Sequence, residues 1–421
     1  TLSHLLSPPE LNTLLSHSRP KLLFTSADRL PDLKPSQEKL GLEHIICPGG
    51  EGGDLDFDAL IAKGPKPISA LEREASDIAC VLYTGGTTGV PKGVLLSHEN
   101  VLSAVHNVAY YERSTPADRA LCFLPFNHVF GQMHIMNATI YSCGGLVLMP
   151  GFDLEGVLQT VAQNKVTKLY AVPTVYVRLL QVPDIKERLA SVRYCFSAAA
   201  SMAQEVVNQW RQITDLDIYE AYGMTETASL VTYNHYYQHK VGSVGSAAGT
   251  TEVCIQDQQG NPLPAGQEGE ICIRGRNVMQ GYLDNPQATA QTMRHGWLHS
   301  GDIGYLDDEG YLFIVDRLKD LIITGGENVY PREVEEGLYQ CAEVAECAVI
   351  GLPDAEYGER VTAYLVLKSG AELDKQAIKN FCRQSLAPFK VPKDFIAMDS
   401  LPTSAAGKIL KRELRRAVLD S

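Results

Sequence analysis

The 421-residue chain is long enough for two or three domains at roughly 150 residues each, and for at least one sizeable buried core. Its 45% apolar and 21% charged residues are ordinary globular values and exclude a disordered or fibrous protein. The formal net charge of -13 disfavours a broad electrostatic hold on nucleic acid or on an acidic membrane surface, but it leaves a local anion site open.

The ten cysteines are scattered along the chain and none forms a CxxC pair, which predicts reduced thiols rather than a disulfide framework. No stretch approaches the roughly 18 uninterrupted apolar residues needed to span a bilayer. The N-terminal segment also lacks the basic and then apolar layout of a signal peptide. We therefore expect a cytoplasmic protein with no integral membrane segment and no nucleic-acid partner.

Between residues 78 and 222, short apolar runs alternate with longer amphipathic segments, a pattern typical of β-α units on a parallel sheet. Each run is apolar on successive residues, as expected when helices cover both faces of the sheet. The predicted strands are residues 78–84, 145–149, 168–172, 192–197 and 217–221. Ser97 is a plausible N-cap, so a helix is expected to follow the glycine-rich stretch after the first strand.

Residues 241–315 change to alternating strands punctuated by glycine-containing turns, which predicts a β-rich part of the first domain. Further on, strands are predicted at residues 348–350 and 361–367, and helices at residues 375–386 and from Pro331. The fold class is therefore α/β. A large N-terminal domain (1–316) of parallel β-α units with a β-rich part is followed by a small, mobile α+β domain (317–421).

A loop of small and hydroxyl-bearing residues follows the first predicted strand. Its glycines leave backbone N–H groups unhindered, its threonines add donors and its lysine adds a cation, a set that suits a polyphosphate. A P-loop NTPase is disfavoured because the Walker A pattern is not matched. A flexible glycine-rich turn is the alternative, but the density of threonines favours phosphate binding. The candidate nucleotide-binding residues are Thr84, Gly85, Gly86, Thr87, Thr88, Gly89 and Lys92.

This loop resembles the phosphate-binding motif of the acyl-adenylate-forming superfamily, which includes acyl-CoA synthetases, aryl-CoA ligases, luciferases and peptide-synthetase adenylation domains. Its other motifs follow in order along nearly the whole chain. The resemblance implies that Tyr222 and Gly223 lie at the nucleotide, that Thr225 contacts the α-phosphate, that Glu226 holds Mg²⁺ and that Asp302 accepts both ribose hydroxyls. The residue types fit, because hydroxyl and carboxylate groups suit phosphate, a hard cation and a diol.

The same resemblance assigns roles to five residues near and beyond the domain junction. Arg317 is implied on the ribose and phosphate, and Lys319 at the hinge. Gly325 and Gly326 are implied beside the tunnel for the thiol acceptor, where glycines let a narrow arm pass. Lys408 is implied to bridge the carboxylate and the α-phosphate during adenylation, a place where two anions require a cation.

The acyl pocket is also expected from the resemblance. His128 lies in a motif that gates access to the carboxyl carbon, and no Asp near it would pair with an amine, which disfavours an amino acid. Arg178 lies in a segment similar to that of malonyl-CoA synthetases, where an arginine pairs with a distal carboxylate. Ala199 and Ala200 have small side chains, and a pocket that they line would have room for a bulky or long acyl group. We favour a fatty or aryl monocarboxylic acid.

The implied activity is a two-step ligase reaction. A carboxylate and Mg-ATP give an acyl-adenylate and pyrophosphate, and the thiol of coenzyme A then takes the acyl group. The alternatives are loading of a carrier-protein phosphopantetheine, a diacid ligase similar to malonyl-CoA synthetase and, less favoured, an ATP-binding module without turnover. A module without turnover is disfavoured by the joint presence of Lys92, Thr225, Glu226, Asp302, Arg317 and Lys408.

The resemblance begins partway into the family's large domain, so residues 5–25 are expected to form the helix and strand that follow an earlier β-α region. Missing strands would expose an apolar sheet edge. We therefore expect poorer solubility than for a complete relative, seen as aggregate in size-exclusion chromatography. A clean monodisperse peak would contradict this expectation.

Overall fold

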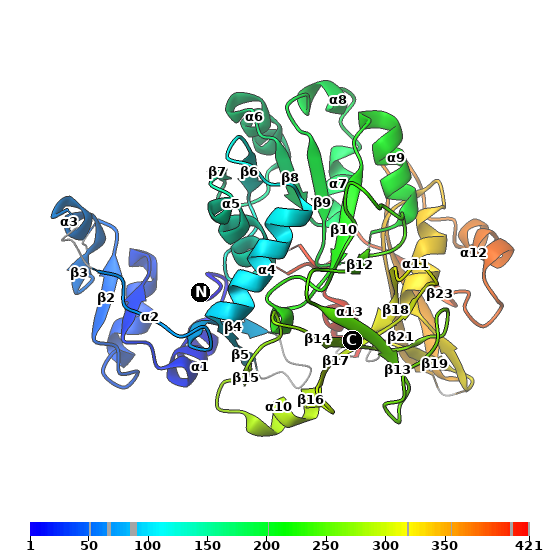
Figure 1. Cartoon of the computed structure of the whole chain (residues 1–421). Coiled ribbons are helices and arrows are strands. Elements are labelled where there is room, and N and C mark those ends of the chain that lie inside the picture. The colour runs from blue at the N-terminus through cyan, green and yellow to red at the C-terminus, as the bar shows by residue number, and fades with distance from the viewer. Residues whose placement is uncertain are drawn as a thin grey trace. The chain divides into compact units, whose positions relative to one another are not determined.

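The computed structural model describes residues 1–49, 52–64, 69–84, 91–200, 202–317, 320–354, 356–404 and 407–419. The chain forms two compact units (Figure 1). The first is Thr1–His98 with Gln280–Pro286, and the second is Glu99–Met279 with Gln287–Ser421. The predicted domain boundary between residues 316 and 317 lies within the second unit and stays a prediction.

The first unit begins with a small parallel sheet in which β1 pairs with β2 and β2 pairs with β3. Leu15, Leu33 and Ile45 are buried in its core. Its elements are α1 (Pro8–Ser18), β1 (Leu22–Phe24), α2 (Leu30–Leu33), β2 (His44–Cys47), β3 (Leu55–Asp56) and α3 (Phe57–Ala62). The first helix and strand agree with the pair expected over residues 5–25.

The second sheet of this unit corrects the prediction around the glycine-rich loop. β4 (Ile78–Thr84) pairs antiparallel with β5 (Lys92–Ser97), and β15 (Gly281–Tyr282) pairs with β5. β4 is therefore not part of a parallel sheet, and a strand separates the glycine-rich stretch from α4 (His98–Tyr111). The physical reason is the apolar run within β5, which has the length of a strand and is too short for a helix.

The main sheet of the second unit has the strand order β12-β11-β10-β9-β8-β6-β7. The neighbours from β10 to β7 are parallel, whereas β11 and β12 are antiparallel at one edge. This confirms the predicted β-α sheet. Its strands are β6 (Arg119–Cys122), β7 (Gly145–Leu148), β8 (Lys168–Ala171), β9 (Tyr194–Ser197), β10 (Ile218–Tyr222), β11 (Thr232–Tyr233) and β12 (Ser246–Ala247). The helices after α4 are α5 (Ala138–Tyr141), α6 (Leu154–Asn164), α7 (Pro173–Leu179), α8 (Ile185–Arg188) and α9 (Gln204–Thr214).

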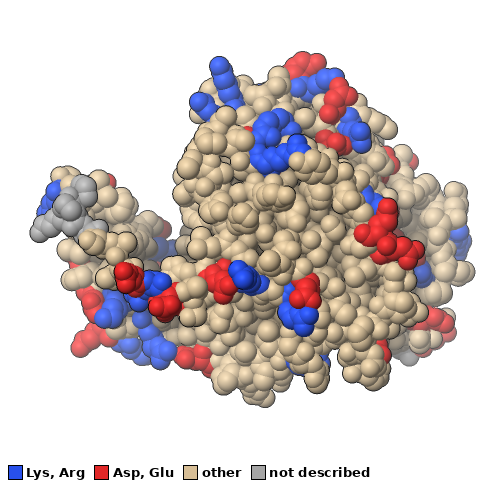
Figure 2. All heavy atoms as spheres, in the orientation of Figure 1, with Lys and Arg blue, Asp and Glu red and all other residues tan. Residues whose placement is uncertain are grey.

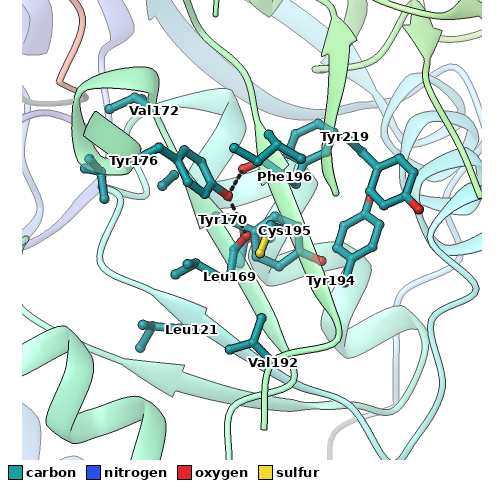
Figure 3. Packing of buried hydrophobic residues seen from close by; sticks show 14 of the residues in the cluster. Leu121, Leu169, Tyr170, Val172, Tyr176, Val192, Tyr194, Cys195, Phe196 and Tyr219 are labelled. Atoms are coloured by element: carbon teal, nitrogen blue, oxygen red, sulfur yellow. Dashed lines mark hydrogen bonds between the residues drawn. The ribbon is translucent and has the colours of Figure 1, made fainter. Parts of the chain in front are cut away.

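Aromatic side chains from β8, β9 and α7 pack in the core of this sheet (Figure 3). The Tyr176 hydroxyl lies 3.2 Å from the carbonyl oxygen of Leu169 and 2.9 Å from that of Phe196. Tyr176 belongs to α7, so these contacts fasten the start of that helix to two neighbouring strands. The segment from Val172 onward, which was predicted to line the acyl pocket, is therefore held rigidly.

A buried network surrounds Glu112, just beyond α4. Glu112 accepts from His134 at 2.9 Å, from the Lys168 ammonium at 2.8 Å, from the Tyr233 hydroxyl at 2.9 Å and from the Tyr170 hydroxyl. Burial alone would raise the pKa of Glu112, but the Lys168 charge and the His134 contact outweigh it and hold that pKa well below its usual range. The network links α4 to β8 and to the π-helix (Phe130–Asn137) that contains His134.

Replacing Glu112 with glutamine is expected to lower the free energy of unfolding by about 3–5 kcal/mol at pH 7, because Lys168 then stays buried without a carboxylate. Since the pKa of Glu112 is lowered by folding, its contribution is complete above its unfolded value of ~4.3 and is lost as the pH falls through the lower folded value. Urea unfolding at pH 7 and at pH 3 measures both effects.

A matched control for that variant is Asp215→Asn, which removes the partner of Lys186 from an exposed ion pair. The control is expected to leave the free energy of unfolding almost unchanged, because an ion pair between exposed side chains contributes little. Equal losses from the buried and the exposed substitution at pH 7 would contradict the role given to the buried network.

A second sheet of the same unit confirms the β-rich part predicted after residue 241. Its order is β13-β14-β17-β16, and β18 pairs with β17. Ile255, Ile271, Ile273 and Leu298 are buried from its strands. The elements of this region are β13 (Glu252–Gln256), β14 (Gly269–Arg274), α10 (Pro286–Thr292), β16 (Met293–Arg294), β17 (Trp297–Leu306) and β18 (Leu312–Arg317).

The C-terminal part mixes strands and helices as predicted. Its strand order is β20-β19-β22-β21, and β23 pairs with β22. Pro331 is the first residue of α11, where its missing N–H costs nothing. The elements are β19 (Ile322–Thr324), β20 (Glu327–Val329), α11 (Pro331–Tyr339), β21 (Val344–Asp354), β22 (Gly358–Leu367), α12 (Lys375–Ser385), β23 (Asp394–Ala397) and α13 (Lys411–Leu419).

The surface in Figure 2 carries Lys and Arg side chains interspersed with Asp and Glu. Many of the charges visible there lie next to charges of the opposite sign, and broad neutral areas separate them. Within the described ranges, every helix is too short or too polar to cross a membrane.

Candidate active site

The end of β10 carries the first group of predicted nucleotide residues. A Cβ on Gly223 would lie only 1.5 Å from a backbone oxygen of Ser229, so only glycine lets the chain fold back here. The N–H of Met279 donates to the carbonyl of Glu226 at 2.8 Å. The Glu226 side chain is buried, and Thr225 is half-buried. A hydroxyl and a carboxylate are thus held at the carboxyl end of a central strand, where open α/β sheets bind their ligands.

Asp302 on β17 lies next to this strand end. The Tyr222 hydroxyl donates to Oδ2 of Asp302 at 2.6 Å, and both residues are buried. Arg317 is directly opposite Asp302 in the antiparallel register of β17 and β18. The fold therefore brings together three predicted nucleotide residues that are far apart in the sequence. The side chain of Arg317 and the whole of Lys319 lie outside the described part of the chain.

Glu270 on β14 supports the irregular part of β17 that carries Asp302, where the pairing of the two strands shifts register, and the sequence analysis missed it. Its Oε1 accepts from the Gly301 N–H at 3.1 Å, next to Asp302. The Ser300 hydroxyl donates to the Ile271 carbonyl at 2.6 Å and accepts from the Asp302 N–H at 3.1 Å. The sequence does carry a signal for Glu270. Side chains alternate between the two faces of a strand, and Ile271 and Ile273 occupy the apolar face of β14, so Glu270 belongs to the opposite face.

Lys408 lies on a tight hairpin of the C-terminal part. Thr403 and Ile409 form an antiparallel bridge, and the Ser404 N–H donates to the Lys408 carbonyl at 2.8 Å. Gly407 has a φ of 78°, and a Cβ there would lie 2.7 Å from Cγ2 of Val172. The hairpin is therefore packed against the segment that starts α7.

His128 lies close enough to Lys408 for the charge of the lysine to act on it. Its Nδ1 accepts from the Phe130 N–H at 3.2 Å. Burial, and then the positive charge of Lys408, lower the pKa of His128 to about 4. The imidazole is therefore neutral at pH 7.

Helix α11, in the C-terminal part of the chain, also contacts the region of the main sheet. The Gln204 N–H donates to Glu336 at 3.3 Å. Glu220, two residues before the end of β10, is buried. Burial raises the pKa of Glu220 to about 8, although the positive charge of Arg332 acts to lower it. Two regions of the C-terminal part, the Lys408 hairpin and α11, thus contact the main-sheet part of the same unit.

Gly407→Ala is expected to slow acyl-adenylate formation by about 10-fold or more, because the new methyl group strains a positive φ and collides with Val172. Gly370→Ala is the matched control: Gly370 has a φ of 81° but nothing lies within 4 Å of a Cβ there. Pyrophosphate release before addition of coenzyme A measures the step. Equal rates for the two variants would contradict the docking role of the hairpin.

The first unit carries the start of the phosphate loop. Thr84 ends β4 and is paired with Lys92 in β5. The Lys92 ammonium lies 4.8 Å from the centroid of the Tyr282 ring. The predicted loop residues between them lie outside the described ranges: Gly85, Gly86, Thr87, Thr88 and Gly89. Their phosphate-binding role stays a prediction.

Gly325 and Gly326 form the turn between β19 and β20. Their φ values are 60° and 85°, which non-glycine residues rarely adopt. The Gly325 N–H donates to the Tyr357 carbonyl at 2.8 Å. The backbone requires both glycines, and their place beside a thiol tunnel stays a prediction.

The three residues predicted to line the acyl pocket differ in burial. Ala199, with a φ of 71°, is partly buried against the main core, whereas Ala200 is exposed. Arg178 is exposed, with its guanidinium carbon 5.9 Å from the centroid of the Phe152 ring. Its charge also opposes the rise in the pKa of Glu346 that burial causes. The charge of Arg178 therefore acts on a carboxyl group of β21.

The comparisons with known proteins identify the family. The family model described as "AMP-binding enzyme" matches residues 1–283, and the model "AMP-binding enzyme C-terminal domain" matches residues 333–408. The chain belongs to the AMP-binding enzyme family. This confirms the resemblance drawn from the motifs.

Curated members of the AMP-binding enzyme family give the reaction class. The long-chain-fatty-acid–CoA ligase of Bacillus subtilis (strain 168) is 41% identical over 344 residues, 80% of this chain and 61% of the relative. The feruloyl-CoA synthase of an Amycolatopsis species is 39% identical over 419 residues, 99% of this chain and 82% of the relative. The chain thus spans less than two thirds of the Bacillus ligase. It is of the AMP-forming acyl-CoA synthetase type.

Solved structures show the same fold. ATP-bound MatB from Rhodopseudomonas palustris matches with a TM-score of 0.92 and 36% identity, covering 100% of this chain and 83% of that one. The anthranilate CoA ligase AuaEII in complex with anthranoyl-AMP matches with a TM-score of 0.92 and 30% identity, covering 99% and 81%. These matches confirm the α/β class with a large N-terminal and a small C-terminal domain.

Proposed function

We propose that this chain activates a fatty or aryl monocarboxylic acid as an acyl-adenylate, using Mg-ATP, and then transfers the acyl group to coenzyme A. The observation that carries the proposal is the packing of the Lys408 hairpin against Val172, next to the neutral His128. Glu226 and Asp302 lie in the same unit of the chain. These observations support a role for Lys408 as the cation between the carboxylate and the α-phosphate.

In the first step, a carboxylate oxygen attacks the α-phosphorus of ATP, and the bond to the β-phosphate breaks to release pyrophosphate. Both reactants are anions, and negative charge is spread over the phosphoryl oxygens in the transition state. The Lys408 ammonium binds both anions and lowers the barrier electrostatically. Asp302 holds the ribose, so the α-phosphorus is oriented toward the acid.

Glu226 is the residue that would hold Mg²⁺. It offers a buried carboxylate at a strand end beside the half-buried hydroxyl of Thr225, a hard oxygen donor set of the kind that Mg²⁺ prefers. When bound, Mg²⁺ neutralises charge on the phosphates. Glu226 itself orients the ion, and its backbone carbonyl is fixed by Met279.

In the second step, the sulfur of coenzyme A attacks the acyl carbon, the bond to AMP breaks, and the thiol proton is released to solvent. Lys408 is no longer needed, and withdrawal of its domain opens the site. The names of the relatives support coenzyme A as the acceptor. A carrier-protein phosphopantetheine is the second candidate, because it presents the same thiol.

The surroundings of Arg178 favour a monocarboxylic acid over a diacid. An arginine that binds a distal carboxylate would have to be buried and free of other partners. Arg178 is exposed, and its charge already acts on the carboxyl group of Glu346. The relatives named for a long-chain fatty acid and for a feruloyl group support the same choice.

Pyrophosphate release from Mg-ATP, measured across fatty, aryl, dicarboxylic and amino acids with and without coenzyme A, tests the proposal. We expect release that depends on a fatty or aryl acid and rises with coenzyme A. Release stimulated only by a carrier protein would overturn the choice of acceptor. Release with dicarboxylates alone would overturn the acid class, and nucleotide binding without release under any condition would overturn the activity.

A further inference from the structure

The strands β13, β14 and β17 are neighbours in one sheet, and metal-ligating residues lie opposite one another across it. Cys254 is directly opposite Cys272, and Cys272 is directly opposite His299. Residues opposite one another in antiparallel strands project from the same face of the sheet. Glu270, two residues before Cys272, belongs to that face too. Three neighbouring strands thus contribute two thiols, an imidazole and a carboxylate.

The ligand atoms of three of these residues converge. Nδ1 of His299 lies 2.8 Å from Oε2 of Glu270 and 3.4 Å from Sγ of Cys272, and one ligand atom from each lies within 4.8 Å of the others. In a tetrahedral zinc site with bonds of about 2.0–2.3 Å, ligand atoms are about 3.3–3.8 Å apart. Small side-chain adjustments therefore suffice to place an ion between these atoms.

The surroundings favour a bound ion. Cys272 is buried and the side chain of His299 is 7% exposed, whereas Cys254 and Glu270 are half-buried and leave a route from solvent. Nε2 of His299 is buried without a hydrogen-bond partner among the described residues. Both Glu270 and Cys272 therefore contact the ring through Nδ1. Arg294 lies 3.2 Å from Oε2 of Glu270 but is half-exposed and free to move outward.

We propose that Glu270, Cys272 and His299 form a binding site for a thiol-preferring divalent cation such as Zn²⁺, with Cys254 supplying the fourth ligand. Thiolate, imidazole and carboxylate are the usual zinc ligands, and four from three strands complete a tetrahedral set. On binding, the thiols release their protons to solvent. The ion links β13, β14 and β17, and so it stabilises the sheet that carries Asp302. The site is independent of the proposed ligase activity.

Equilibrium dialysis against Zn²⁺, with metal analysis of the protein kept in a non-thiol reductant, tests the proposal on the whole chain. We expect one ion per chain, a rise in Tm on binding and, with Co²⁺, a thiolate-to-cobalt absorption band. Cys272→Ser and His299→Gln should each weaken binding by about 10- to 100-fold or more and remove or shift that band. Cys254→Ser should weaken it less, because that thiol lies farther from the other three.

Cys143→Ser is the matched control, because it removes an exposed thiol away from this sheet and should leave binding unchanged. Circular dichroism checks the fold of every variant. If Cys272→Ser fails to fold, Glu270→Gln and Cys254→Ser decide the matter at half-buried positions. Absence of stoichiometric binding to the wild type, or equal binding by the wild type and the folded site variants, would overturn the proposal.

Discussion

Lys408→Ala is expected to lower the rate of acyl-adenylate formation by about 10²–10³-fold, the loss typical of removing one group that stabilises transition-state charge. The structure supports a large effect, because burial and the charge of Lys408 lower the pKa of His128 to about 4, so the neutral imidazole of His128 cannot supply the missing charge. Acid-dependent exchange of pyrophosphate into ATP measures this step alone.

The second half-reaction separates a chemical role from a structural one. A chemically prepared acyl-adenylate, given with coenzyme A, should yield thioester at a rate within about threefold of the wild type, because Lys408 acts only before that intermediate exists. Lys375→Ala removes an exposed cation at the start of α12 and should change neither step. If Lys408→Ala left pyrophosphate exchange unchanged, the proposed mechanism would be wrong.

The sequence predicted the framework where the residue pattern is local. Continuous apolar runs identified β7 to β10, and Pro331 marked the start of α11. The motif residues Tyr222, Asp302 and Arg317 were found by resemblance, and the strand register explains why they are neighbours. Their individual roles stay predictions.

The sequence did not predict the elements whose conformation depends on tertiary contacts. The π-helix Phe130–Asn137 has no helical apolar period, and it is set by the bond of His134 to buried Glu112. A Cβ on Gly131 would lie 2.5 Å from the Pro125 carbonyl oxygen, so this turn depends on a close backbone approach that composition does not reveal. The strand β5 was missed for a different reason, because its short apolar run was not recognised as a strand that pairs with β4 across the glycine-rich loop.

Asp302→Asn is expected to raise the KM for ATP by about 10- to 100-fold, because a neutral amide forms weaker hydrogen bonds to hydroxyl groups than a carboxylate does. The buried position of Asp302 makes the exchange of a charge for an amide more consequential than at the surface. Steady-state kinetics with ATP and with 2′-deoxy-ATP measure it. The wild type should prefer ATP, and the variant should lose most of that preference.

Two further variants separate the ribose contact from the support of the carboxylate. Tyr222→Phe removes only the hydroxyl that donates to Asp302 at 2.6 Å, so it should raise the KM by a few-fold and keep the preference for ATP over the 2′-deoxy compound. Asp307→Asn changes a carboxylate five residues further on, whose partner is Lys240, and should leave the KM unchanged. Because misfolding would lower kcat for both nucleotides alike, a loss confined to the ratio between them assigns Asp302 to the ribose. Equal KM values for ATP in Asp302→Asn and the wild type would exclude that assignment.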